Sequence, residues 1–132
     1  MHETEHRVIY ADTDAGGVVY YANYLKWFES GRRELFRNLE IDYNSLQSKG
    51  ILVPVVEVHC NYLAPARYDD LLLLETSIAE IKEKSIKFEY KLFKKDGVKL
   101  LVTGHTVNVF VDSKEMKSTK IPESVKNKLK TG

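Results

Sequence analysis

One stretch of this sequence limits the possible folds more than any other. Residues 22–40 show the only strong helical period, and its apolar face spans half of the helix circumference. At about 100° per residue, that half carries Tyr24, Leu25, Trp27, Phe28, Gly31, Leu35, Phe36 and Leu39. The other half carries Lys26, Glu29, Ser30, Arg33, Glu34 and Arg37. An apolar face this wide, with four aromatic residues, predicts a helix that other parts of the chain cover.

Two residues on that apolar face interrupt the pattern. A glycine inside a helix costs up to about 1 kcal/mol, so Gly31 predicts the close approach of a neighbouring backbone. Arg32 needs a carboxylate partner or a path for its charged head to reach solvent, because an unpaired buried charge is costly. Asp12, Asp14 and Glu29 are the candidate partners, and packing of the stem with the head in water is the alternative.

The rest of the chain predicts long strands joined by tight turns. Alternating or continuous apolar runs mark the expected strands, at residues 6–11, 51–64, 71–82, 85–94 and 98–111. Pro54 indicates a strand start or a sheet edge, and Gly104 indicates a bulge. The short connections at 83–84 and 95–97 predict an antiparallel meander. A short helix is expected after Pro122.

The lengths of these elements predict an α+β architecture. The helix should extend about 28 Å, whereas strands of about 12 residues reach roughly 40 Å, so the strands can curl around the helix. We therefore expect a long central helix wrapped by a curved antiparallel five-stranded sheet. Because such a sheet leaves exposed edge strands, pairing with a second copy of the chain is expected.

Composition narrows the class of protein. A chain of 132 residues predicts one domain over residues 1–132, with 43% hydrophobic and 30% charged residues as in ordinary globular proteins. The net charge of +1 gives no basic surface for nucleic acid. One cysteine, Cys60, fits a reducing compartment. We find no apolar run of membrane-spanning length and no signal peptide, so a cytoplasmic location is expected.

Common catalytic motifs are absent. The sequence has no GxSxG elbow, no GxxxxGKS phosphate loop and no GxGxxG fingerprint. The four histidines lack metal-ligand spacing, so no metal site is expected. His59, His105 and Cys60 are interpreted as packing or edge residues.

The stretch DTDAGGVVYYANY, residues 12–24, is the remaining candidate for chemistry. Asp14 precedes Gly16 and Gly17, and the helix begins soon afterwards. The first amides of a helix have no internal partner and lie at the positive end of its dipole, so they can bind an oxyanion. A carboxylate beside such amides suits acyl transfer. Alternatively, Asp12 or Asp14 only caps the helix or shapes the turn.

Three segments resemble a known family. RVIYADTDAGGVVYYANYLKWFESGRRELFR at 7–37, YLAPARYDDLLLLET at 62–76 and VDSKEMKSTKIPES near the end closely resemble the 4-hydroxybenzoyl-CoA thioesterase family of hotdog-fold proteins. The likeness is greatest to its bacterial acyl-CoA thioesterase branch from the Tol-Pal gene cluster. The resemblance implies the hotdog fold, an acyl-CoA substrate, no bound cofactor, an active site at a homodimer interface, and pairing of dimers into a homotetramer.

The resemblance also implies roles for particular residues. Asp14 matches the catalytic carboxylate, as nucleophile or as general base. The backbone amide of Tyr21 matches the group that polarises the thioester oxygen, and Gly17 and Val18 line the same turn. Many members of the branch have histidine at position 21, whereas relatives that act on aromatic acyl groups have tyrosine there, so acyl preference stays open.

Two basic residues lie where relatives bind the phosphates of coenzyme A. These are Arg67 in the PAR turn and Lys84 beside Ser85. The alternative is that both are ordinary solvated charges.

The sequence thus predicts an acyl-CoA thioesterase that needs neither metal nor cofactor. The alternatives are a non-enzymatic module that binds acyl thioesters or a partner, and a thioesterase for acyl groups on acyl carrier protein. A hotdog dehydratase ranks lowest, because it needs a histidine at the helix start and none lies there.

Overall fold

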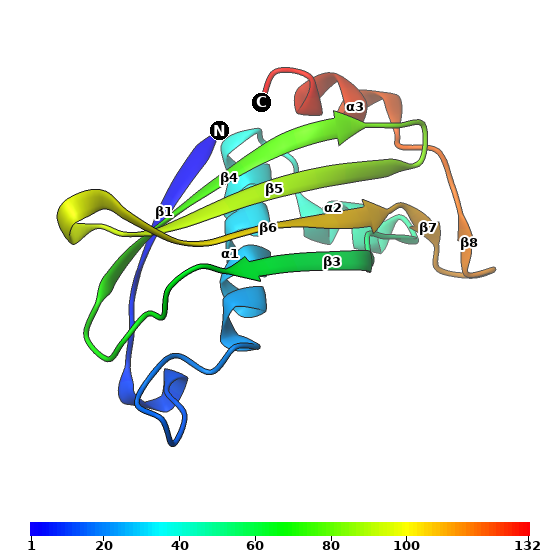
Figure 1. Ribbon diagram of the computed structural model, residues 1–132. Helices are drawn as coiled ribbons and strands as arrows, with labels where there is room; N and C mark the ends of the chain where they lie inside the picture. Colours follow the sequence, from blue (N-terminus) through cyan, green and yellow to red (C-terminus); the bar gives the residue numbers. More distant parts are fainter.

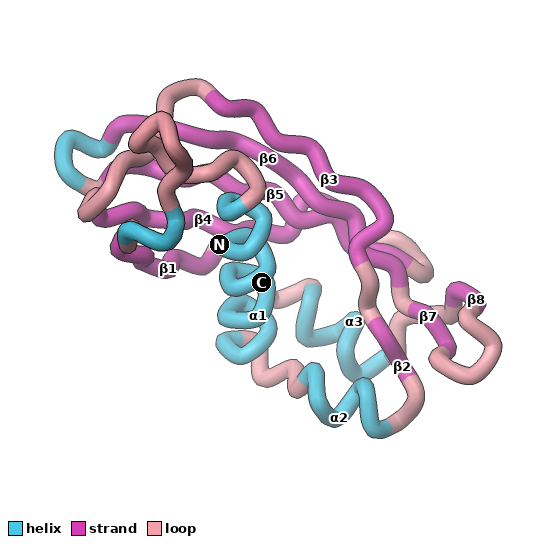
Figure 2. The backbone as a smooth tube through the Cα atoms, turned by 90° about the horizontal axis from the view of Figure 1, so that it is seen from below, coloured by secondary structure: helices cyan, strands magenta, loops and turns pink.

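A curved antiparallel sheet wraps around one long helix (Figures 1 and 2). The computed structural model describes all 132 residues. The helix is α1, Asn23–Asn38. The sheet has the order β1-β4-β5-β6-β3, and these strands are β1 His2–Arg7, β3 Val55–Tyr62, β4 Leu71–Ile81, β5 Ser85–Lys94 and β6 Lys99–Val109. The predicted α+β arrangement of a central helix and a five-stranded antiparallel sheet is confirmed.

Shorter elements close the ends of this structure. Two 3₁₀ turns, two helices and a second sheet of order β2-β7-β8 make up the set: η1 Tyr10–Asp12, α2 Tyr43–Ser48, β2 Ile51–Leu52, η2 Asp96–Val98, β7 Val111–Asp112, β8 Lys117–Ser118 and α3 Glu123–Leu129. The expected helix after Pro122 is α3, while α2 and the second sheet were not predicted. No helix is long and apolar enough to cross a lipid bilayer.

The core lies between α1 and the concave face of the sheet. Phe28 is 1% exposed, and its ring stacks on that of Tyr90 with 4.1 Å between centroids and 6° between planes. A Cβ added to Gly31 would lie 2.4 Å from Thr76 Oγ1, so this glycine allows close contact between the helix and the sheet. The close approach is confirmed, but the predicted backbone neighbour is wrong, because the approaching atoms belong to side chains of β4.

Three sequence predictions differ from the structure. The first strand covers residues 2–7 and not 6–11, because the chain turns into η1 at Tyr10. The expected strand 51–64 is divided into β2 and β3 around Pro54, and β3 is an edge strand, as the proline indicated. Gly104 pairs regularly with Cys60 and Tyr90, so it is not a bulge.

Gly104 has a different use. A Cβ there would lie 2.9 Å from the Phe28 ring and 2.6 Å from the His59 carbonyl oxygen. The glycine therefore makes room for the central aromatic ring of α1, which local sequence could not indicate.

Arg32 has no carboxylate partner within ion-pair distance. Its Nη1 instead donates a hydrogen bond to the Tyr90 hydroxyl at 3.1 Å. That hydroxyl lies 2.6 Å from Thr106 Oγ1. The ion-pair alternative is wrong, and the half-buried guanidinium keeps most of its donors unused.

Candidate active site

A narrow loop between η1 and α1 positions Asp14. Thr13 and Val19 form an antiparallel bridge, and the Asp14 amide donates to the Val18 carbonyl at 2.9 Å. The Gly17 amide donates back to the Asp14 carbonyl at 3.0 Å. Gly17 has φ of +80°, a left-handed conformation that glycine adopts without strain. The DTDAGG segment therefore specifies this tight turn.

The Asp14 carboxylate has both a structural contact and a free oxygen. Its Oδ1 accepts a hydrogen bond from the Gly16 amide at 2.8 Å, so the turn-shaping role considered from sequence is confirmed. Oδ2 has no hydrogen-bond partner within the chain. Capping of α1 by either aspartate is wrong, because its N-cap is Ala22 without any side-chain cap. Asp12 instead caps η1, where its Oδ2 accepts a hydrogen bond from the Ile9 amide at 3.0 Å.

The start of α1 offers unpaired donors next to this loop. The amides of Tyr21 and Ala22 donate to no group in the chain, whereas the Asn23 amide donates to the Tyr20 carbonyl. No acidic residue lies in the first helical turn. These amides therefore remain available to an oxygen atom of a ligand, in the favourable field of the helix dipole.

The PAR turn and two tyrosines hold this arrangement in place. The Val19 amide donates to the Ala66 carbonyl at 2.9 Å, and the Ala66 amide donates to the Tyr24 hydroxyl at 3.3 Å. The Tyr62 hydroxyl donates to the Tyr21 carbonyl at 3.0 Å. Burial raises the pKa of both Tyr24 and Tyr62, so each keeps its hydroxyl proton at neutral pH.

These groups surround an open hollow of about 320 Å³. Its walls are Asp14, Val18, Val19, Tyr21, Tyr24, Tyr62, Leu63, Ala64 and Pro65. Three of the predicted site residues, Asp14, Val18 and Tyr21, thus come together. Gly17 forms the adjacent turn, and Arg67 pairs with Val18 through a backbone bridge at the rim.

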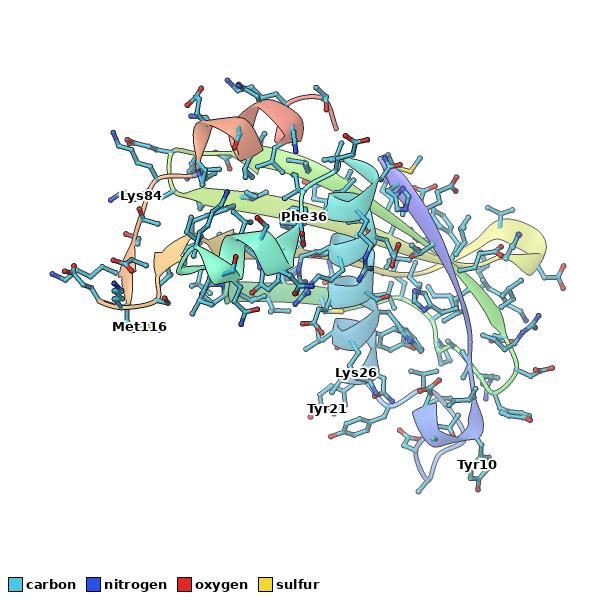
Figure 3. The ribbon with its side chains drawn as sticks, turned by 180° about the vertical axis from the view of Figure 1, so that it is seen from behind. Tyr10, Tyr21, Lys26, Phe36, Lys84 and Met116 are labelled. Atoms are coloured by element: carbon cyan, nitrogen blue, oxygen red, sulfur yellow. The ribbon has the colours of Figure 1, made fainter.

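Lys84 lies elsewhere in the protomer. It belongs to the turn between β4 and β5, where its carbonyl accepts from the Phe110 amide, and Figure 3 shows it well apart from Tyr21. Within one subunit, Lys84 therefore does not lie near Asp14. Its role toward coenzyme A stays a prediction that requires a second subunit.

Sequence reasoning missed Tyr24 and Tyr62 as site residues. Helical periodicity placed Tyr24 on the apolar face of the predicted helix, but only the long-range contact between α1 and β3 brings it to Tyr62, with 5.5 Å between ring centroids. The neighbouring Cys60 is half-buried, and burial raises the pKa of its thiol.

The histidines near the sheet edge are not part of this hollow. The rings of His59 and His105 stack with 5.2 Å between centroids, and His105 Nε2 lies 2.9 Å from Glu57 Oε2. Both line a separate hollow that Asp14 does not border. No group of three or more histidine, cysteine, aspartate or glutamate side chains is arranged to hold a metal ion.

Comparison with known proteins gives a consistent result. Residues 8–129 match the family model of the thioesterase-like superfamily. The acyl-CoA thioesterase YbgC of Haemophilus influenzae is 41% identical over 122 residues, which cover 91% of this chain and 88% of YbgC. The 4-hydroxybenzoyl-CoA thioesterase of a Pseudomonas species is 25% identical over 126 residues, which cover 89% of each chain.

Solved structures agree with the fold. The gentisyl-coenzyme A thioesterase BH1999 superposes with a TM-score of 0.87 at 31% identity, covering 97% of this chain and 99% of that one. The predicted hotdog fold is therefore confirmed. The chain belongs to the thioesterase-like superfamily, with acyl-CoA and 4-hydroxybenzoyl-CoA thioesterases among its relatives.

Proposed function

We propose that this protein is an acyl-CoA thioesterase, which hydrolyses an acyl-CoA thioester to a free carboxylic acid and coenzyme A. One observation carries the proposal: the Asp14 carboxylate and the start of α1, with the unpaired Tyr21 amide, meet at the same hollow. The names of its relatives support the substrate class, because YbgC is an acyl-CoA thioesterase and BH1999 a gentisyl-coenzyme A thioesterase.

The geometry supports a reaction whose first step can take one of two alternative routes. The thioester oxygen would accept hydrogen bonds from the Tyr21 and Ala22 amides, which stabilise negative charge as it develops. Asp14 either removes a proton from water, whose oxygen attacks the carbonyl carbon, or attacks that carbon itself to form a mixed anhydride that water then hydrolyses. In both routes the C–S bond breaks and the coenzyme A sulfur takes up a proton.

A thiol-release assay tests this function. The purified protein is incubated with short aliphatic, long aliphatic and aromatic acyl-CoA substrates, and with the same acyl groups on acyl carrier protein. We expect release of coenzyme A from at least one thioester class, because attack and oxyanion stabilisation depend on the thioester and not on the acyl group. Saturable binding of acyl-CoA without thiol release would instead identify a binding module, and release from carrier protein alone would identify the other thioesterase class.

We further infer that the site is completed by a second subunit paired along β3. The strand has one neighbour in the sheet, and its apolar residues Val56, Val58 and Tyr62 are 60%, 45% and 49% exposed. The opposite edge strand, β1, has the charged sequence HETEHR. An exposed apolar edge strand favours pairing with another chain, whereas charged side chains on an edge strand disfavour it.

Antiparallel pairing of two β3 strands would place the beginning of one beside the end of the other. Lys84 lies at the end of the sheet where β3 begins, since Ser85 pairs with Val109 and the Val109 amide donates to the Pro54 carbonyl. Tyr62 and Asp14 lie at the other end. A two-fold dimer would therefore bring Lys84 of each subunit toward Asp14 of its partner, as a coenzyme A phosphate ligand would require.

Substitution of Val58 by lysine tests the interface. A lysine in the middle of β3 would place two like charges close together across the two-fold axis, so we expect the dimer dissociation constant to rise at least about tenfold. Analytical ultracentrifugation measures the change against the chain mass of 15.2 kDa. The matched control is Glu3→Lys on β1, which should leave the dimer intact; a dimer that survives Val58→Lys and dissociates with Glu3→Lys would place the interface on the other edge.

A further inference from the structure

A second cavity, separate from the Asp14 hollow, lies between the middle of α1 and the beginning of β3. Its volume is about 180 Å³, and its polar walls are Glu29, Arg32, Arg33 and Asn108. Phe36, Val53, Val55 and Phe88 form most of the apolar walls. The proposed reaction uses none of these residues.

The charged groups of this cavity favour an anion. Neither Arg32 nor Arg33 is in an ion pair, and Glu29 offsets only one of the two positive charges. The Arg33 guanidinium lies 4.0 Å from the Tyr43 ring centre. Arg32 donates one hydrogen bond to the neutral Tyr90 hydroxyl. A guanidinium has five donors and matches the two oxygens of a carboxylate.

Asn108 closes the inner wall of the cavity. The residue is 3% exposed, and its Nδ2 donates to the Val53 carbonyl at 3.1 Å. Its Oδ1 is buried away from the cavity. The guanidinium groups of Arg32 and Arg33 are therefore the groups of this cavity that can bind a ligand.

The cavity and the Asp14 hollow lie at opposite ends of β3. Pro54 and Val55 at the beginning of β3 line it, whereas Tyr62 at the end of β3 lines the hollow of Asp14. In the two-fold dimer inferred above, the cavity of one subunit would therefore adjoin the Asp14 hollow of its partner. A volume of about six water molecules suits a few polar atoms at the end of an acyl chain.

On the basis of the proposed function, we propose that this cavity binds the distal end of the acyl group and selects acyl chains that end in a carboxylate. Arg32 holds the carboxylate, and Arg33 adds positive charge. The substrate class is then the coenzyme A monothioesters of dicarboxylic acids.

Two five-carbon thioesters test the proposal: valeryl-CoA and glutaryl-CoA, with uncatalysed hydrolysis subtracted. We expect kcat/KM for glutaryl-CoA to exceed that for valeryl-CoA at least about tenfold. In Arg32→Gln the advantage should fall at least about tenfold, mainly through KM. Arg37→Gln, the same change on an exposed part of the same helix, should keep it. Equal rates for the two substrates, or an unchanged preference in Arg32→Gln, would overturn the proposal.

A binding experiment separates this proposal from the proposed function. Calorimetric titration with free glutarate and with uncharged valeramide needs no catalysis, and we expect at least about tenfold tighter binding of glutarate, lost in Arg32→Gln. If no thioester is hydrolysed but this preference is seen, the function fails and the binding site stands. If thioesters are hydrolysed but glutarate does not bind preferentially, the function stands and the subsite is wrong.

Discussion

Replacement of Asp14 by asparagine is expected to lower kcat/KM for thioester hydrolysis at least about 1,000-fold, or about 4 kcal/mol in the activation barrier. The amide of asparagine can still accept the Gly16 hydrogen bond that Oδ1 accepts at 2.8 Å, so the turn should keep its shape. It cannot attack a thioester or remove a proton from water. Stopped assays of thiol release with the best substrate from the panel would measure the loss.

The control for this variant is Asp12→Asn, the same change two residues earlier. Asp12 accepts a hydrogen bond from the Ile9 amide at 3.0 Å, which asparagine preserves, and it does not line the hollow. Its rate should stay near that of the wild type. If Asp14→Asn retained wild-type turnover with intact fold, Asp14 would be a turn residue alone and the catalytic carboxylate would have to be sought elsewhere.

The fold could be predicted because its main elements are long and periodic. The apolar face of residues 22–40 and the clean alternation of 85–94 report burial directly, and the helix Asn23–Asn38 and the strand Ser85–Lys94 follow them closely. The helix Tyr43–Ser48, the strand Lys117–Ser118 and the pairing of the second sheet escaped prediction. Elements this short gain their stability from contacts distant in sequence, so local pattern carries little signal for them.

The candidate site was predictable where its parts are close in the chain. Asp14, Val18 and Tyr21 lie within eight residues, so the loop and the helix start necessarily meet. Tyr62 could not be assigned, because its contact with Tyr21 joins residues 41 positions apart. The unpaired guanidinium of Arg32 was visible as an anomaly on the helical wheel, but only the tertiary structure shows the cavity that it borders.

Replacement of Phe28 by alanine is expected to remove about 3–5 kcal/mol from the free energy of unfolding, a large share of the about 5–15 kcal/mol of a typical domain. Phe28 is 1% exposed, stacks on Tyr90 and occupies the space that Gly104 leaves open. Backbone of β3 and β6 borders that space at His59 and Gly104, so it cannot readily collapse and the substitution would leave a cavity. Urea unfolding followed by circular dichroism measures the loss.

The control is Leu25→Ala on the same helix, where the side chain is 37% exposed; it should cost about 1 kcal/mol or less. A smaller loss for Phe28→Ala than for Leu25→Ala would contradict a core organised around the central helix, because the buried aromatic ring would then contribute less than a side chain in partial contact with water.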